Sequence, residues 1–176
     1  MKKAKQKIIV IDGPTGAGKT TTADLLKPKL EKTAIVGLDR IKWFLSVCSR
    51  TKRCNQMTAD IILAMCKRYI EHGASLLLEQ SFRSPQIIEP YLKLAKKKGI
   101  VLYLYELTAP ENVLLKRVKS RPKPKFAKKK LPIKRVKANI NCYLNPRRSS
   151  SARIIFDTSR LSRKIIVQTI MQDIKK

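Results

Sequence analysis

Five short apolar runs recur along the chain, separated by longer segments of mixed polarity. The runs lack the strict apolar–polar alternation of a half-exposed strand, which indicates strands buried on both faces. They lie near residues 7–12, 33–37, 75–79, 100–105 and 153–156. Strands that alternate with helical segments in this way predict a three-layer α/β fold, with a five-stranded parallel sheet between two layers of helices.

The segments between the runs repeat apolar residues at the three- and four-residue spacing of amphipathic helices. In the segment 56–72, Met57, Ile61, Met65 and Tyr69 form one apolar stripe, which we expect to face the core. Helices are expected at 20–30, 40–47, 56–72, 85–98, 108–119 and 133–144, with a last helix marked by Ile166, Ile170 and Ile174.

Some helix ends carry recognisable end signals. Pro85 is typical of a first helical turn, and Gly73 and Gly99 are typical of positions just past a helix end. Thr108 and Glu111 have the spacing of a capping box, in which each side chain caps the other's backbone amide. We therefore expect a helix to begin at this capping box and to end near Lys119.

The length of 176 residues suits one domain, 1–176, with a single core. Between Ser120 and Pro132, three prolines and many lysines interrupt the helical spacing, so we expect an exposed, mobile segment. Together with the predicted helix at 133–144, this segment would form a lid over about 120–145. The residues Pro146 to Ser151 then read as a linker into the last strand.

The cysteines and the hydropathy predict a protein of the cytoplasm. Four cysteines and one histidine show no spacing typical of a zinc site or a disulfide framework, so we expect reduced thiols. No apolar run approaches the roughly 18 residues that a membrane span requires. The N-terminus leads directly into the first strand without a signal peptide.

The net charge is extreme, because 40 Lys and Arg residues face 12 Asp and Glu residues, which gives +28. One interpretation is a polyanionic partner, RNA or DNA, held through its phosphates. The other is a lysine-rich composition of the source, with a local need to bind nucleotide phosphates. The segment from Lys116 to Lys137, with twelve basic residues and no acidic one, fits a phosphate clamp or a solvated loop.

Five acidic residues each follow one of the apolar runs: Asp12, Asp39, Glu79, Glu106 and Asp157. In an open parallel sheet, ligands bind beyond the carboxyl ends of the strands. These carboxylates are therefore expected to gather at the ligand-binding edge of the sheet.

The first run ends in a phosphate-binding motif, which we call the phosphate loop (residues 13–21). Its sequence is Gly13, Pro14, Thr15, Gly16, Ala17, Gly18, Lys19, Thr20 and Thr21. Glycines permit tight turns and the close approach of an anion, and the following helix presents free N–H groups to it. Lys19 would offset β- and γ-phosphate charge, and the Thr20 hydroxyl would bind Mg²⁺. The expected ligand is ATP or GTP.

The rest of the sequence favours a small kinase. An Asn-Lys-x-Asp motif that would read guanine is missing, as is an Asp-x-x-Gly motif after the phosphate loop. Asp39 follows the second strand, one sheet position from the phosphate loop, where it would accept the proton of an acceptor hydroxyl or merely cap a helix. Arg117 and Arg121 are four residues apart and would converge on one anion, or lie as surface arginines.

The acceptor side has weaker candidates. Glu79 would hold Mg²⁺ through water, hydrogen-bond an acceptor hydroxyl, or serve as a plain loop carboxylate. Arg40 and Arg83 are candidates to contact the acceptor. Trp43, like Phe44 and Tyr69, would line an acceptor pocket or pack in the core.

Taken together, DGPTGAGKTT, GLDR, LLLEQSF, LYELTAPENVLLKRVKSR and FDTSRLSRKIIVQTI resemble the P-loop kinases of the adenylate-kinase-like group. Among these, the chain is similar to zeta toxins, chloramphenicol phosphotransferases and polynucleotide kinases over nearly its whole length. The resemblance implies the sheet order 2-3-1-4-5, ATP as donor and Mg²⁺ as cofactor. It carries over Lys19, Thr20, Asp39, Arg117 and Arg121 as functional residues, and 157–160 as the loop on the adenine side. Glu79 stands where many relatives have aspartate.

Three functions remain open at this point. The first is an ATP-dependent kinase of a small acceptor that resembles a nucleoside or nucleotide. The second is a kinase of a polynucleotide 5′-hydroxyl, which the charge of +28 favours. The third is a nucleotide-dependent RNA-binding protein without transferase activity. None of the three involves a membrane partner.

Overall fold

The computed structural model describes residues 5–42, 44, 51–122, 131–145 and 150–175. Trp43 therefore lies outside the described residues. So do the end of the helix expected at 40–47, most of the linker at 146–151, and positions 123–130 of the expected lid.

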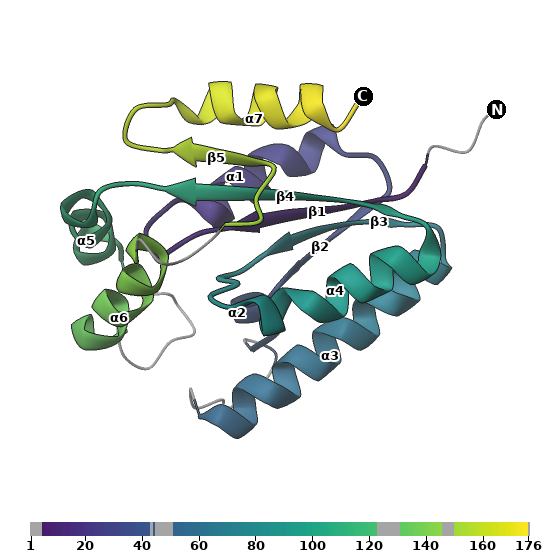
Figure 1. Cartoon of the computed structure of the whole chain (residues 1–176), viewed down its shortest axis with the longest axis horizontal. Helices are drawn as coiled ribbons and strands as arrows, with labels where there is room; N and C mark the ends of the chain where they lie inside the picture. The colour runs from purple at the N-terminus through teal and green to yellow at the C-terminus, as the bar shows by residue number, and fades with distance from the viewer. Residues whose placement is uncertain (1–4, 43, 45–50, 123–130, 146–149, 176) are drawn as a thin grey trace.

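The sheet is parallel throughout, and its strand order is β2-β3-β1-β4-β5. This confirms the predicted fold class and order. The strands end within a few residues of the expected positions, and all five point toward the same edge (Figure 1). Their bounds are β1 Lys7–Asp12, β2 Thr33–Gly37, β3 Ser75–Glu79, β4 Val101–Thr108 and β5 Ile154–Asp157.

Helices cover both faces of the sheet, so the fold has three layers. Figure 1 shows α3 and α4 on one face, α1 and α7 on the other, and α5 and α6 beyond the carboxyl ends of the strands. None of the helices in the described part of the chain has the length and apolarity needed to cross a bilayer. The helices are α1 Lys19–Leu26, α2 Leu38–Lys42, α3 Lys52–Glu71, α4 Pro85–Lys98, α5 Glu111–Ser120, α6 Ile133–Leu144 and α7 Arg163–Asp173, with a short 3₁₀ turn at Lys27–Lys29.

The central strand β1 shows why the apolar runs lack alternation. Ile9 and Ile11 belong to the core cluster on the side of α1 and α7, which includes Ile170. Ile8 and Val10 belong to the cluster on the side of α3 and α4. Because successive side chains of a strand point to opposite faces, a strand covered on both sides needs apolar residues at every position.

The apolar stripe expected on α3 is wrong at three of its four positions. Met57, Ile61 and Tyr69 are 42%, 39% and 41% exposed, whereas Met65 packs against the core. Thr58 faces the core instead, and its hydroxyl donates to the Cys54 carbonyl at 2.7 Å, so a polar side chain is buried without loss of a hydrogen bond. The prediction placed the larger apolar residues on the core-facing side of the helix, although most of them are exposed. The buried stripe is Cys54, Thr58, Ile62, Cys66 and Ile70.

The predicted capping box is also wrong. Thr108 belongs to β4, where it pairs with Asp157 of β5. Helix α5 begins three residues later, at Glu111, and no side chain caps it. Because Thr108 is the last residue of β4, it does not cap the helix α5.

The expectation of reduced thiols fails at one cysteine. Cys54 is disulfide-bonded, and its partner lies outside the described residues. Cys66 and Cys142 are free, and burial raises the pKa of Cys66 to about 12. An ordinary reactive thiolate is therefore not available at Cys66.

Candidate active site

The phosphate loop joins β1 to α1 at the carboxyl edge of the sheet. Gly13, Gly16 and Gly18 have φ angles of 138°, 92° and 97°, a region that other residues rarely adopt. A Cβ atom at Gly13 would lie 2.2 Å from the Leu107 carbonyl oxygen, and one at Gly16 would lie 2.8 Å from the Leu114 carbonyl oxygen. Glycine is therefore required for the loop to lie against β4 and α5.

Lys19 lies at the start of α1 and turns back over the loop. Its ammonium group donates to the carbonyl oxygens of Gly13 and Pro14, each at 2.9 Å. Burial lowers the pKa of Lys19 to about 8, although the carboxylates of Asp12, Glu79 and Asp39 oppose this shift and Arg121 adds to it. The fold thus brings Lys19, Asp39, Glu79 and Arg121, all predicted from the sequence, within electrostatic reach of one another.

The lowered pKa of Lys19 predicts a pH dependence of nucleotide binding. Only the charged ammonium offsets phosphate charge, and its fraction falls as pH rises through the pKa of about 8. Raising the pH from 7 to 9 should therefore weaken Mg-ATP binding about tenfold. Calorimetric titration at both pH values checks this, and Lys19→Met should remove the pH dependence. An affinity of the unmodified protein that is equal at both pH values would contradict it.

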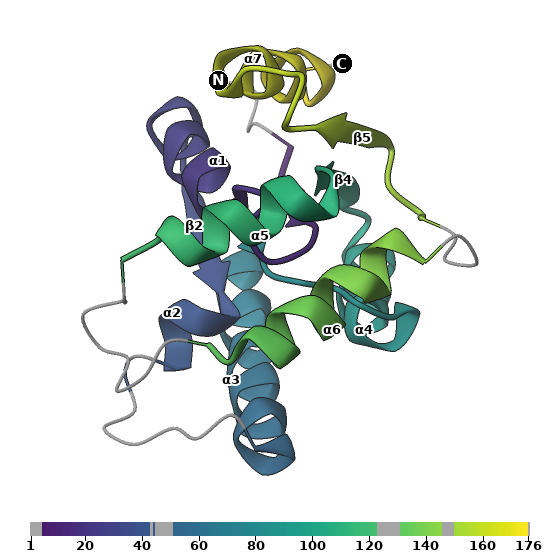
Figure 2. The ribbon, with the colours of Figure 1, turned by 90° about the vertical axis from the view of Figure 1, so that its left-hand side faces the viewer.

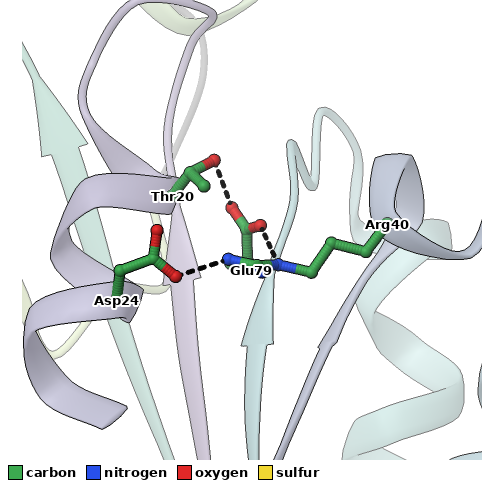
Figure 3. Close-up of polar contacts among 4 residues, drawn as sticks. All are labelled: Thr20, Asp24, Arg40 and Glu79. Carbon is green, nitrogen blue, oxygen red and sulfur yellow. Dashed lines mark hydrogen bonds and ion pairs between the residues drawn. The ribbon is translucent and has the colours of Figure 1, made fainter. Parts of the chain in front are cut away.

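Thr20 and Glu79 form the part of the site that suits a divalent cation. The Thr20 hydroxyl donates to Glu79 Oε2 at 2.9 Å, and Glu79 is buried at the end of β3 (Figure 3). Two hard oxygen ligands beside a phosphate loop match Mg²⁺, which is bound by few protein groups together with substrate phosphates. The described residues hold no cluster of three or more His, Cys, Asp or Glu side chains that would bind a metal by itself.

Arg40 connects this cation site to α2. Its Nε donates to Glu79 Oε1 at 3.1 Å, and its Nη2 pairs with Asp24 Oδ1 of α1 at 2.7 Å (Figure 3). Gly37 packs closely against Glu79, because a Cβ atom at position 37 would lie 3.0 Å from both the carbonyl oxygen and Oε1 of Glu79, so a larger residue would have to displace Glu79 slightly. The sequence predicts that Arg40 contacts the acceptor. In the structure, its side chain links α2 to Asp24 of α1 and to Glu79 of β3.

Asp39 is exposed in the first turn of α2. The sequence analysis placed it one sheet position from the phosphate loop. This is wrong, because β3 lies between β2 and β1. Asp39 therefore lies just after β2, with β3 between β2 and the strand that carries the loop, and it interacts electrostatically with Lys19.

The two arginines of the predicted clamp have different partners. Arg117 donates from Nη1 and Nη2 to the hydroxyl and carbonyl oxygens of Thr158, both at 2.8 Å, in the loop after β5. Arg121 follows the end of α5, is exposed, and interacts electrostatically with Lys19. The two arginines thus have different neighbours, and their convergence on one anion stays a prediction. Their roles in catalysis stay predictions.

The remaining acceptor candidates lie at the surface. Arg83 is exposed between β3 and α4. Phe44 is 84% exposed and Tyr69 is 41% exposed, so neither packs in the core as expected. Within the described residues, none of these three side chains makes a hydrogen bond or an ion pair with the phosphate loop. Contact with an acceptor stays a prediction for Arg83.

Helix α6 holds the phosphate loop from the side, which the sequence analysis missed. Asn139 Oδ1 accepts from the Thr15 amide at 2.6 Å and from the Thr15 hydroxyl at 2.9 Å. The Tyr143 hydroxyl donates to Asp12, which also accepts from the backbone amides of Gly13 and Phe82. Burial raises the pKa of Asp12. The sequence does indicate polar contacts on this side of α6, because Asn139 and Tyr143, four residues apart, lie on its apolar side.

Removal of the Asn139 amide should weaken the loop. In Asn139→Ala, the partly buried amide of Thr15 loses its acceptor, which costs about 1 kcal/mol of stability. We expect a lower denaturation midpoint in urea and weaker ATP binding. Asn141→Ala, at an exposed position of the same helix, is the matched control. If the two variants have the same stability and the same ATP affinity, α6 does not support the loop.

Comparison with protein families and curated sequences gives one match. A family profile described as an AAA domain, AAA_33, matches residues 8–143. This range contains the phosphate loop, Asp39, Glu79 and both predicted arginines. A search of curated proteins finds no match.

Solved structures show the same fold at low sequence identity. The tunicamycin resistance protein of Deinococcus radiodurans is 20% identical, with a TM-score of 0.66 over 97% of this chain and 96% of that chain. APS kinase CysC of Mycobacterium tuberculosis, in complex with AMPPNP and APS, is 14% identical, with a TM-score of 0.69 over 98% and 99%. A chain of the Pnkp1/Rnl/Hen1 RNA repair complex is 13% identical, with a TM-score of 0.68 over 80% of this chain and 44% of that chain.

Proposed function

The chain belongs to the AAA_33 family of AAA domains and has a P-loop kinase-like fold, and from this premise we propose that it is an ATP-dependent kinase. The proposed reaction moves the γ-phosphoryl group of ATP to a hydroxyl or phosphate of a small acceptor that resembles a nucleoside or nucleotide. The family and the fold are compatible with several reactions of phosphate groups. The particular reaction is therefore inferred from the residues of the site.

The observation that carries the proposal is the arrangement around Lys19. Thr20 and Glu79 are joined by a hydrogen bond beside it, and Asp39 interacts with it from across the end of β3. A phosphate loop alone explains nucleotide binding. An exposed carboxylate within electrostatic range of Lys19 adds a group able to take a proton from an attacking hydroxyl.

Each residue has a role in the proposed transfer. Thr20 and Glu79 would hold Mg²⁺, which supplies charge neutralisation to the phosphates when bound. Lys19 offsets the charge on the β- and γ-phosphoryl oxygens. Asp39 accepts the proton of the acceptor hydroxyl as its oxygen attacks phosphorus, and ADP leaves with the electrons of the broken P–O bond.

The two arginines fit different ends of ATP. Arg117 is bonded to Thr158, in the loop whose counterpart in similar kinases lies on the adenine side. Arg121 lies near Lys19, on the phosphate side. Under the proposal, Arg121 adds positive charge at the transferring phosphoryl group, and Arg117 supports the wall around the base.

A screen of acceptors tests the proposal. ADP release from Mg-ATP is measured with a panel of nucleosides, nucleotides, antibiotics and oligonucleotides. We expect at least one acceptor to raise ADP release well above slow hydrolysis, with one phosphorylated product per ADP. ATP that binds tightly but is never turned over with any acceptor would contradict the proposal and favour a nucleotide-dependent binding protein.

A second candidate is the phosphorylation of a polynucleotide 5′-hydroxyl. It is favoured by the net charge of +28 and by the similarity to a chain of an RNA repair complex. Salt separates the two candidates, because a polynucleotide acceptor would give a KM that rises steeply with salt concentration, whereas a small acceptor would give a shallow dependence. If a single-stranded oligonucleotide receives no label from γ-labelled ATP, the second candidate fails.

A further inference from the structure

Five basic residues of α5 and α6 are exposed and have no carboxylate partner among the described residues. We call the side chains of Lys116, Lys119, Lys134, Arg135 and Lys137 the α5–α6 basic surface. None of the five makes an ion pair or a side-chain hydrogen bond within the described chain. The sequence explains this, because no Asp or Glu occurs from residue 112 to residue 156.

Some basic residues elsewhere in the fold have carboxylate partners. Arg40 is bound by two carboxylates, and Arg68, Lys93, Arg153 and Arg160 each meet one. The five side chains of the α5–α6 basic surface have none in the described part of the chain, and the two helices that carry them contact each other. The basic composition and the long stretch without Asp or Glu together create this surface.

The α5–α6 basic surface lies beside the candidate active site. Helices α5 and α6 contact each other and lie beyond the carboxyl ends of the strands, on the side that faces the viewer in Figure 2. Gly16 of the phosphate loop packs against Leu114 of α5, and Thr15 is bonded to Asn139 of α6. Arg121, at the C-terminal end of α5, adds a positive charge within electrostatic range of Lys19.

We propose that the α5–α6 basic surface binds the phosphate backbone of single-stranded RNA or DNA. Repeated positive charge without base-reading geometry suits a repeated anion, and lysine or arginine contacts to phosphates supply sequence-independent affinity. Because the surface adjoins the site, a strand bound there has its end close to Lys19. Binding itself does not depend on the proposed phosphotransfer.

An anionic membrane is the competing polyanion, and α6 argues against it. A helix that lies in a membrane interface combines basic residues with an apolar face that inserts into the lipid. The apolar face of α6 is already used, because Val136, Ile140 and Tyr143 are 0%, 0% and 7% exposed. Between its two ends, the solvent side of α6 offers charge and small or polar side chains only, which suits phosphates in water.

Two charge reversals of equal size test the surface. Lys134→Glu with Lys137→Glu changes α6, and Lys96→Glu with Lys97→Glu makes the same net change at the end of α4, which precedes β4 at the opposite edge of the sheet. Binding of a fluorescent 20-nucleotide single-stranded RNA is measured by anisotropy from low to moderate salt. Thermal unfolding and ATP titration confirm that each variant is folded and binds nucleotide.

The α6 variant should bind the RNA at least tenfold more weakly at low salt. Its plot of log affinity against log salt should be shallower by about 1.4, which corresponds to two lost phosphate contacts. The α4 variant should lose no more than about threefold and keep the slope. Equal losses in both variants, no RNA binding by the unmodified protein at low salt, or α6-dependent binding to vesicles with anionic lipid but not to RNA would each overturn the proposal.

Discussion

Replacing Lys19 by methionine should lower the kcat/KM of phosphoryl transfer by about a thousandfold, the scale of losing one charged stabilising group in a preorganised site. The ammonium group is the cation that lies directly over the phosphate loop, where it is bonded to the Gly13 and Pro14 carbonyl oxygens. Methionine keeps much of the length of the side chain and removes the charge. Initial rates at several ATP concentrations give the loss.

The control for Lys19→Met is Lys98→Met, at the exposed end of α4. It removes the same charge from the far edge of the sheet and should leave kcat/KM within about twofold, as surface substitutions usually do. If Lys19→Met retains more than about a tenth of the activity, the phosphate loop is not the donor site. That result would remove the basis for the assignment of ATP as donor.

Replacing Asp39 by asparagine should abolish transfer to a hydroxyl and spare ATP binding. Loss of a general base typically costs a factor of about 10² to 10⁴ in rate. Asp39 is exposed and makes no hydrogen bond or ion pair with the described residues, so the substitution should not unfold the protein. The kcat with the best acceptor and the Kd for Mg-ATP separate the two effects.

Asp60→Asn is the matched control, because Asp60 is an exposed carboxylate on α3 whose partner is Gln56. It should retain full activity. Equal kcat values for Asp39→Asn and Asp60→Asn would exclude Asp39 as the base. A parallel loss of ATP affinity and rate in Asp39→Asn would instead indicate a role in donor binding.

The sheet and the phosphate loop could be predicted because their signals are local. An unbroken apolar run such as Ile8–Ile11 marks a strand covered on both faces, and glycines at positions 13, 16 and 18 permit a loop that other residues would block. The strand order could not be predicted from local patterns, because the spacing of apolar residues does not show which strands are neighbours. The order followed from the resemblance to known kinases.

The wrong and the missed predictions have local and long-range causes. The core-facing side of α3 was misassigned because Thr58 satisfies its own hydroxyl within the helix and is buried. The bond between Asn139 and Thr15 joins residues 124 positions apart, and no local pattern names such a partner. Likewise, the spacing of Arg117 and Arg121 placed them on one face but did not show that Thr158 binds the first of them.

The fate of the γ-phosphoryl group tests the central claim most directly. ATP labelled at the γ position is mixed with the protein, Mg²⁺ and the acceptor that most stimulates ADP release, and the products are followed by ³¹P NMR or by separation of the label. We predict that the label appears on the acceptor in a one-to-one ratio with ADP, and that Asp39→Asn prevents this. Label found only in inorganic phosphate, or only in unreacted ATP, would contradict the account.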